Sequence, residues 1–186
     1  MKYVFPEKRE EHISFILQKT NTIKYLFSTL LTQSSGSKHK GQKIVTSLGI
    51  IILAAGQGTR MRSRLPKVLH PLAGKPLLGH VLDAATNLNP QRMVVVHGYG
   101  GEQVKAIFSS STVLWVEQTP LLGTGHAVQQ ALPQLQQVEQ ILVLYGDVPL
   151  IDTNTLHQLI DKAISNKALG LISIKIRPQN SLHWVL

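Results

Sequence analysis

The sequence lacks cysteine altogether, has few aromatic residues and contains no long apolar run. Without cysteine, the chain can form no disulfide, no thiolate metal site and no cysteine nucleophile, which fits a reducing compartment such as the cytoplasm. Only 5% of the 186 residues are aromatic, which argues against the stacking platforms that bind single-stranded nucleic acids. A membrane-spanning helix needs about 20 consecutive apolar residues, and no stretch of the sequence provides them. We therefore expect a cytoplasmic protein without a membrane span.

Several motifs that identify common enzyme classes are also absent. The sequence has neither the GxxxxGK[ST] loop of P-loop enzymes nor the third glycine that completes the GxGxxG fingerprint of dinucleotide-binding folds. It has no GxSxG motif around a nucleophilic serine. Its eight histidines do not stand at metal-ligand spacing, so we interpret them as residues of the surface or of the edge of the core. These absences disfavour P-loop enzymes, NAD-type dehydrogenases, serine hydrolases and zinc sites.

The formal net charge is +9, and it is unevenly distributed. Residues 1–47 hold eight Lys and Arg against three Glu, whereas the other 139 residues hold eleven basic and seven acidic side chains. A strongly basic protein can bind nucleic acid or an acidic membrane surface. More than half of the excess positive charge lies in the first quarter of the chain, outside the predicted domain, and we expect no nucleic-acid partner.

We expect a basic N-terminal extension at residues 1–47, followed by a folded domain at residues 48–186. Apolar residues at roughly helical spacing predict an amphipathic helix near residues 10–31, and the polar, Gly- and Ser-rich residues 33–43 are typical of a linker. Lysines interrupt the helix and glutamates precede it, which disfavours a membrane span and a targeting peptide. Two interpretations stay open: a solvated appendage or start-site artefact, which we favour, and a helix that binds a membrane or a partner.

From residue 48 onward, short apolar runs alternate with helical patterns. The runs predict strands at 48–55, 93–98, 112–118, 140–147 and 168–176, of which the first two are typical of strands buried on both faces. Helices are predicted at 76–88, 101–108, 123–132 and 153–165. The alternation predicts an α/β fold with a Rossmann-like, mostly parallel sheet and helices on both faces. In such a sheet the ligand binds beyond the carboxyl ends of the strands, which are followed by the loops that begin at Gly56, His97, Gln118 and Tyr145.

The loop after the first strand, AAGQGTRMRSRLPKVL (54–69), has the composition of an anion-binding loop. Gly56 and Gly58 have no side chains to keep backbone N–H groups away from an anion, and Arg60 and Lys67 add two cations. This composition suits the phosphates of a nucleoside triphosphate. The simpler interpretation, a tight turn that needs glycine for its geometry, stays open at this point.

A carboxylate follows the fourth apolar strand, in LYGDVPL (144–150). Asp147 should project into the same crevice, and a hard carboxylate beside phosphates is a usual ligand of Mg²⁺. A turn or capping role is the alternative for Asp147. Capping is the better interpretation of Asp152, which directly precedes a predicted helix.

A third polar loop lies in EQTPLLGTGHA (117–127). The carboxamide of Gln118 offers both a donor and an acceptor, which can read the edge of a nucleobase. Gly123 permits close approach of a ligand, and Thr124 and Gly125 open a helix. The alternative is an ordinary loop in which Thr124 caps that helix.

Together, ILAAGQGTRMRSRLPKVLHPLAGKPLLGHV, EQTPLLGTGHAVQQA and ILVLYGDVPLI resemble the signature of the sugar nucleotidyltransferases. Within that family they are similar to the N-acetylglucosamine-1-phosphate uridyltransferase domains of the bacterial bifunctional enzymes that are also glucosamine-1-phosphate acetyltransferases. The resemblance runs from about residue 48 to about residue 176. It implies an enzyme that converts UTP and N-acetylglucosamine 1-phosphate into UDP-N-acetylglucosamine and pyrophosphate with Mg²⁺. It also implies that full-length members are homotrimers, through a domain that this sequence does not contain.

The resemblance implies roles for individual residues. Arg60 matches the catalytic arginine that neutralises the departing pyrophosphate, and Lys67 matches the lysine that holds phosphate. The positions that hold the nucleotide are Leu53, Ala54, Ala55, Gly56, Gly58 and Thr59. Those of uracil recognition are Gln118, Gly123 and Thr124. Those that meet the sugar and the metal are Tyr145, Gly146 and Asp147, with Asp147 as the metal ligand.

After residue 176 the resemblance ends. The family continues with a Gly-Tyr-Gly-Arg loop and with Glu and Asn residues that grip the sugar, one Asn being a second ligand of Mg²⁺, whereas this chain reads RPQNSLHWVL. We therefore expect a domain that is incomplete at its C-terminal end, by truncation or frameshift, and whose activity is impaired. Two alternatives stay open: another nucleotidyltransferase of the same fold, such as a molybdenum-cofactor guanylyltransferase, and a non-catalytic nucleotide-binding fragment.

Overall fold

The structure, a computed structural model, describes residues 47–58, 61–109 and 111–172. The extension predicted at residues 1–47 lies outside this part except for Ser47, and so do Thr59 and Arg60. The described residues belong to two compact units that meet in the sequence between His157 and Gln158. The first unit contains the sheet and every described residue of the predicted site.

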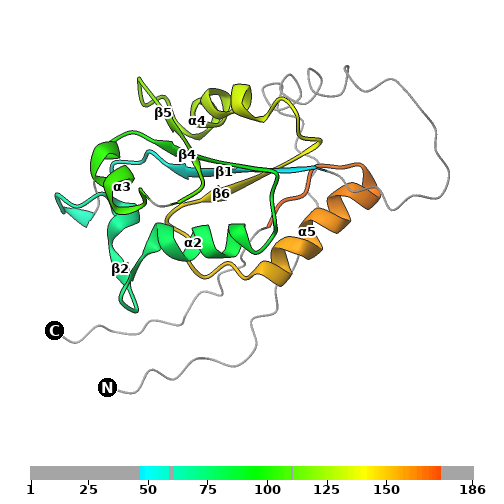
Figure 1. The fold of residues 1–186 in the computed structure, drawn as a ribbon, viewed down its shortest axis with the longest axis horizontal. Helices are drawn as coiled ribbons and strands as arrows, with labels where there is room; N and C mark the ends of the chain where they lie inside the picture. The colour runs from blue at the N-terminus through cyan, green and yellow to red at the C-terminus, as the bar shows by residue number, and fades with distance from the viewer. Residues whose placement is uncertain (1–46, 59–60, 110, 173–186) are drawn as a thin grey trace, which may run out of the picture. The chain divides into compact units, whose positions relative to one another are not determined.

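Four parallel strands form the sheet, as the alternating pattern predicts (Figure 1). They are β1 (Leu48–Ala54), β4 (Arg92–His97), β5 (Leu114–Glu117) and β6 (Gln140–Tyr145), in the order β5-β4-β1-β6. Each neighbouring pair is parallel, and the register places Ile51 of β1 between Val94 of β4 and Val143 of β6. Because all four strands run the same way, their carboxyl ends meet at one edge of the sheet.

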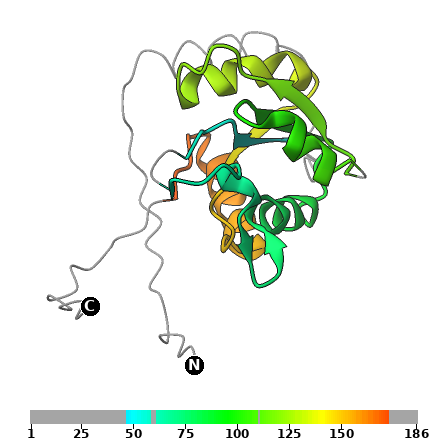
Figure 2. The ribbon, with the colours of Figure 1, turned by 90° about the vertical axis from the view of Figure 1, so that its left-hand side faces the viewer.

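Helices cover both faces of this sheet. Figure 1 shows α4 (Thr124–Ala131) over one face and α2 (Leu77–Thr86) over the other, and Figure 2 shows the same arrangement from a second side. The remaining elements are α3 (Gly101–Ile107), the hairpin of β2 (Pro71–Leu72) and β3 (Lys75–Pro76), the 3-10 helices η2 (Lys67–Leu69) and η3 (Leu132–Leu135), and α5 (Thr153–Asn166). No helix in the described part of the chain is long and apolar enough to cross a membrane.

The core follows from the alternation of side chains along β1 and β4. Ile51, Leu53, Val94 and Val96 face α4 and pack with Ala127, Ala131, Leu135 and Val138. Ile50, Ile52 and Val95 point to the opposite face and are 0% exposed. β1 and β4 are therefore buried on both faces, as their continuous apolar runs predict.

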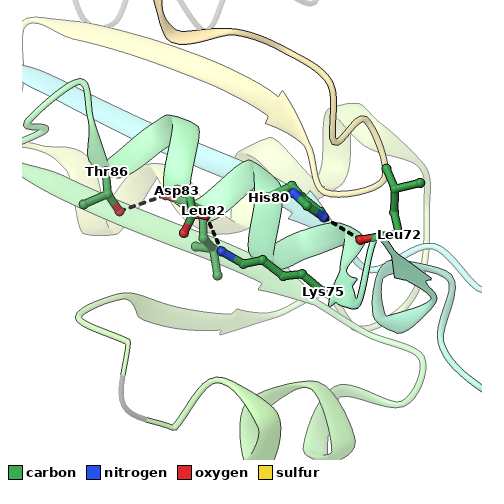
Figure 3. Close-up of polar contacts among 6 residues, drawn as sticks. All are labelled: Leu72, Lys75, His80, Leu82, Asp83 and Thr86. Atoms are coloured by element: carbon green, nitrogen blue, oxygen red, sulfur yellow. Dashed lines mark hydrogen bonds and ion pairs between the residues drawn. The ribbon is translucent and has the colours of Figure 1, made fainter. Parts of the chain in front are cut away.

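Polar contacts tie α2 to the hairpin that precedes it (Figure 3). Lys75 pairs with Asp83, and the ring Nε2 of His80 lies 2.9 Å from the carbonyl oxygen of Leu72. A hollow of about 350 Å³ lies beside this helix, between α2 and residues 111–113, and reaches Met93. It lies at the amino end of β4, at the opposite end of the strand from the edge where a ligand is expected.

The strand predicted at 168–176 is not observed in residues 168–172, and residues 173–176 lie outside the described part. Instead, α5 ends in a Schellman motif: Lys167 N–H donates to Ile164 O (3.1 Å) and Ala168 N–H to Ala163 O (3.0 Å). Lys167 occupies the left-handed position at φ 47°. The apolar run predicted a strand from local composition, but a strand also needs a partner with which to form a ladder.

Candidate functional site

The loops at the carboxyl ends of the strands lie against one another, as predicted. Gly146, after β6, donates its N–H to Leu53 O at the end of β1 (2.9 Å). A Cβ atom placed on Gly98, after β4, would lie 3.1 Å from Ala55 O and 2.6 Å from a methyl group of Leu121. Segments that follow β1, β4, β5 and β6 are thus in direct contact. Residues far apart in the sequence meet in one small region.

Lys67 and Asp147 form an ion pair in this region, across 80 residues of sequence. Their side chains are 36% and 26% exposed, so the pair is partly shielded from water. Pro66 is buried, η2 begins at Lys67, and Asp147 lies in the turn closed by Val148 N–H to Tyr145 O (3.2 Å). Within the described residues the carboxylate of Asp147 pairs with an ammonium group and accepts no backbone N–H, so it caps no helix there, although it does stand in a turn, as the alternative also holds.

The position of Lys67 depends on Gly58. Gly58 has a φ of +62°, and a Cβ atom on it would lie 2.8 Å from Lys67 Cβ. The side chain of Lys67 therefore passes over a residue that must be glycine both for its backbone conformation and for the space it leaves. The simpler interpretation therefore explains Gly58, which must be glycine for its geometry. The same geometry also positions the side chain of Lys67, a cation.

Gln118 is the best-held polar side chain of the region. It is only 4% exposed, and its backbone N–H donates to His97 O (2.8 Å). Its side-chain Nε2 donates to Gly123 O at 2.8 Å and lies 3.2 Å from His126 Nδ1. The carboxamide oxygen has no hydrogen-bond partner within residues 47–58, 61–109 and 111–172, so it remains available as an acceptor.

The other predicted residues fall into two groups. Leu53, Ala54 and Ala55 are at most 9% exposed, so only their backbone can meet a ligand, whereas Tyr145 is 52% exposed. Gly56, Gly123 and Thr124 are exposed. Gly123 caps α4 with φ 91° and no side-chain hydrogen bond, so the alternative in which Thr124 is the cap is wrong.

Two interpretations of individual residues are confirmed. Asp152 caps α5: its Oδ1 accepts from Asn154 N–H (2.8 Å) and Thr155 N–H (3.3 Å). Its hydrogen bond with the Thr155 hydroxyl lowers the pKa of Asp152, and the two backbone donors act in the same direction. His97 lies at the edge of the core, 5% exposed, with its ring 6.1 Å from that of Trp115. Burial lowers the pKa of His97, and nearby Lys105 adds to that effect, so both favour the uncharged form of the ring.

His126 and Gln130 are the residues that the sequence did not identify. Gln130 Nε2 lies 3.0 Å from His126 Nε2, so His126 links Gln118 to Gln130. His126 and Gln130 are four residues apart on α4 and therefore share one side of the helix. That spacing was visible in the sequence, but nothing in it showed that this side faces Gln118.

The donor set at the carboxyl edge suits a divalent cation that prefers oxygen ligands. Within the described residues there is no group of three or more His, Asp or Glu side chains that could enclose a metal. Asp147 supplies a single carboxylate. Mg²⁺ is commonly held by one or two carboxylates while water and substrate phosphates complete its shell, so one carboxylate beside the glycine-containing loop fits such an ion.

A parallel sheet with a glycine-containing loop, a cation and a carboxylate at its carboxyl edge is typical of α/β domains that bind nucleotides. Comparison with protein families gives a match to the MobA-like NTP transferase domain over residues 50–182. The chain belongs to this family.

Two curated relatives illustrate the similarity. The chain is 52% identical over 129 residues to the bifunctional protein GlmU of Janthinobacterium sp. (strain Marseille), and 54% identical over 130 residues to the bifunctional protein GlmU of Nitrosomonas eutropha. Each alignment covers 69% of this chain and 28% of the relative. The chain thus matches little more than a quarter of the length of these relatives.

Solved structures show the same fold at low identity. Rv0371c of Mycobacterium tuberculosis is 24% identical, with a TM-score of 0.56 over 64% of this chain and 61% of that one. A nucleotidyl transferase of Methanothermobacter is 22% identical, with a TM-score of 0.55 over 62% of this chain and 57% of that one. These likenesses support the α/β fold with its parallel sheet.

Proposed function

We propose that this chain contains the nucleotide-binding part of a uridyltransferase that makes UDP-N-acetylglucosamine and pyrophosphate from UTP and N-acetylglucosamine 1-phosphate. The observation that carries the proposal is the pairing of Lys67 with Asp147 beside the glycine-containing loop. An ammonium group and a carboxylate meet there at the carboxyl edge, which supports assigning them to a phosphate and to a metal ion. The similarity to bifunctional GlmU proteins and the resemblance of the three motifs to uridyltransferases support the choice of substrates.

The chemistry needs neutralisation and alignment more than proton transfer. An oxygen of the sugar phosphate attacks the α-phosphorus of UTP, and the bond from that phosphorus to the bridging oxygen breaks, so that pyrophosphate leaves with the electron pair. The attacking oxygen is already ionised at neutral pH, so no general base is required. Because both reactants are anions, the protein contributes mainly by holding positive charge near the phosphates and by keeping the groups in line.

We assign these tasks to three residues. Lys67 would bind a phosphate oxygen, and Arg60, which lies outside the described residues, would neutralise the departing pyrophosphate. Asp147 would hold Mg²⁺, which when bound neutralises phosphate charge. Since Asp147 is paired with Lys67 in the structure, binding of the nucleotide and its metal would separate the two side chains.

Recognition of the base is assigned to Gln118. Its amide N–H groups face Gly123 O and His126 Nδ1, so the carboxamide oxygen is the group assigned to the base. That oxygen can accept a hydrogen bond from the N3–H of uracil. Tyr145, which is exposed at the end of β6, is assigned to the sugar side of the site.

Nucleotide binding and turnover test the proposal separately. Thermal unfolding of the full chain with Mg²⁺ and each nucleoside triphosphate should show the largest stabilisation by UTP. A larger effect of GTP would favour a guanylyltransferase and would contradict our choice. A sensitive pyrophosphate-release assay with UTP, N-acetylglucosamine 1-phosphate and Mg²⁺ then distinguishes an active domain from a fragment that only binds nucleotide.

Arg60→Ala should abolish pyrophosphate release while leaving the melting temperature without ligand unchanged. Arg64→Ala, an exposed arginine of the same loop, is the matched control and should retain turnover. Equal activity of Arg60→Ala and wild type would contradict the role given to Arg60.

A further inference from the structure

A series of hydrogen-bonding groups connects Gln118, in the loop at 118–123, with α4. The carbonyl oxygen of Gly123 accepts from Ala127 N–H in the helix (3.1 Å) and from Gln118 Nε2 (2.8 Å). The same Nε2 lies 3.2 Å from His126 Nδ1, and His126 Nε2 contacts the carboxamide of Gln130. The catalytic chemistry proposed above uses neither His126 nor Gln130.

The carbonyl oxygen of Gly123, the first member of this series, fixes which groups donate and which accept. A main-chain carbonyl can only accept, so the group of Gln118 that faces Gly123 must be its NH₂. The second hydrogen of that NH₂ then points to His126 Nδ1, which must be the unprotonated nitrogen of the ring. The ring proton consequently sits on Nε2. The structure has Gln130 Nε2 against that nitrogen, so the Gln130 carboxamide must be turned by 180° for its oxygen to accept from it.

We propose that His126 is a positioning residue that fixes the orientation of the Gln118 carboxamide and thereby sets the choice of nucleobase. The inference rests on the proposed function, because it explains how the part of the same site that binds the nucleobase distinguishes UTP from CTP. A 180° rotation of the Gln118 amide would place its oxygen against two acceptors, Gly123 O and His126 Nδ1, and would lose two hydrogen bonds. The amide is therefore locked with its oxygen turned away from Gly123 O and His126 Nδ1, which leaves the oxygen as the acceptor for the base.

This orientation has a definite consequence for selectivity. Uracil presents an N3–H donor, which the Gln118 oxygen accepts. Cytosine presents an unprotonated N3, which needs a donor and would face the oxygen without a hydrogen bond. A site that leaves a polar group unpaired against the wrong ligand discriminates strongly, so the lock favours UTP over CTP.

The test measures the dissociation constants of UTP and CTP by calorimetry with Mg²⁺ on the full chain. In His126→Phe the amide keeps only Gly123 as a partner, so rotation becomes easier. We expect the preference for UTP over CTP to fall roughly three- to tenfold, the equivalent of one hydrogen bond. His126→Asn, whose side-chain oxygen can replace Nδ1 as acceptor, should restore most of the preference. Gln129→Phe, at an exposed neighbouring position of α4, should leave it unchanged.

A double-mutant cycle separates positioning from a general effect on the fold. In the Gln118→Ala background, His126→Phe should change the UTP-to-CTP ratio no further. Nitrogen chemical shifts of the wild-type imidazole provide a second readout that needs no variant, and they should show Nε2–H with Nδ1 unprotonated.

Three outcomes overturn the inference. An unchanged ratio in His126→Phe, an equal fall in the Gln118→Ala background, or an Nδ1–H tautomer in the wild type would each exclude the lock while leaving uridyl transfer intact. Absence of any UTP preference in the wild-type chain would instead contradict the proposed base recognition, and the inference would fall with it.

Discussion

The ion pair of Lys67 and Asp147 predicts that, without nucleotide, loss of Lys67 strengthens metal binding, although the lysine is assigned to the substrate. Without nucleotide, a divalent cation must displace the Lys67 ammonium group from the carboxylate of Asp147. Lys67→Met removes that competitor and should therefore strengthen binding of Mn²⁺, used as a probe for Mg²⁺. Lysine and methionine have similar unbranched side chains, so the packing over Gly58 is preserved.

The expected size follows from the exposure of the pair. With side chains 36% and 26% exposed, the pair lies between a surface ion pair and a buried one. A surface pair contributes at most about 1 kcal/mol. Displacing Lys67 therefore costs about 1 kcal/mol, so its removal should lower the dissociation constant of Mn²⁺ about fivefold. Asp147→Asn should remove this binding.

Electron paramagnetic resonance of free Mn²⁺ measures the affinity directly. Lys75→Met is the matched control, because Lys75 also pairs with a carboxylate, that of Asp83, but beside α2 and away from the proposed site. With UTP present the sign should reverse, since Lys67 then binds phosphate and its loss weakens the metal–nucleotide complex. Unchanged or weaker Mn²⁺ binding by Lys67→Met without nucleotide would refute the competition.

Three further predictions concern local structure. Gly123→Ala should lower the free energy of unfolding by about 1–3 kcal/mol and weaken UTP binding, because φ 91° with ψ −179° is a conformation that favours glycine. Gly125→Ala should leave UTP binding intact, since a Cβ atom at that position would have no neighbour within 4 Å. Equal effects of the two variants in UTP titrations would contradict this prediction. Asp152→Ala should destabilise the chain by about 1 kcal/mol at neutral pH. Because the folded state lowers the pKa of Asp152, the stabilisation that its carboxylate provides is present above the unfolded pKa and is lost as the pH falls through the folded pKa. Denaturation at several pH values should therefore show the stabilities of wild type and variant converging in acid. Lys167→Gly should stabilise α5 by about 0.5–1 kcal/mol, measured by circular dichroism during denaturation, since glycine removes the strain of φ 47°.

The parallel sheet was predictable from the sequence because its signal is local and repeated. Continuous runs such as those of β1 and β4 are apolar since both of their faces are covered, and the helices between them fix the parallel direction. The strand predicted at 168–176 shows the limit of that reasoning, because pairing depends on a neighbour that no local pattern reveals. In the structure, Lys167 and Ala168 instead donate the backbone hydrogen bonds that end α5.

The candidate site was predictable in its location but not in its contacts. The topology placed Lys67, Gln118 and Asp147 at the carboxyl edge, and the structure has them there. The sequence could not show that Lys67 and Asp147 pair with each other, because 80 residues separate them. Nor could it show that His126 faces Gln118, since this depends on how the loop at 119–123 returns the chain to α4.

These contacts divide the site into two parts that share no described side-chain contact. The part proposed to bind phosphate joins η2 to the turn after β6 through Lys67 and Asp147. The part proposed to bind the base joins the end of β5 to α4 through Gln118 and His126. Each part is held by its own hydrogen bonds, so substitutions in one should leave the geometry of the other intact. The free-energy changes of Lys67→Met and His126→Phe on UTP binding should then add to within about 0.5 kcal/mol. A larger coupling would mean that the nucleotide is positioned as a rigid unit, so that a shift of its phosphates also moves its base away from Gln118.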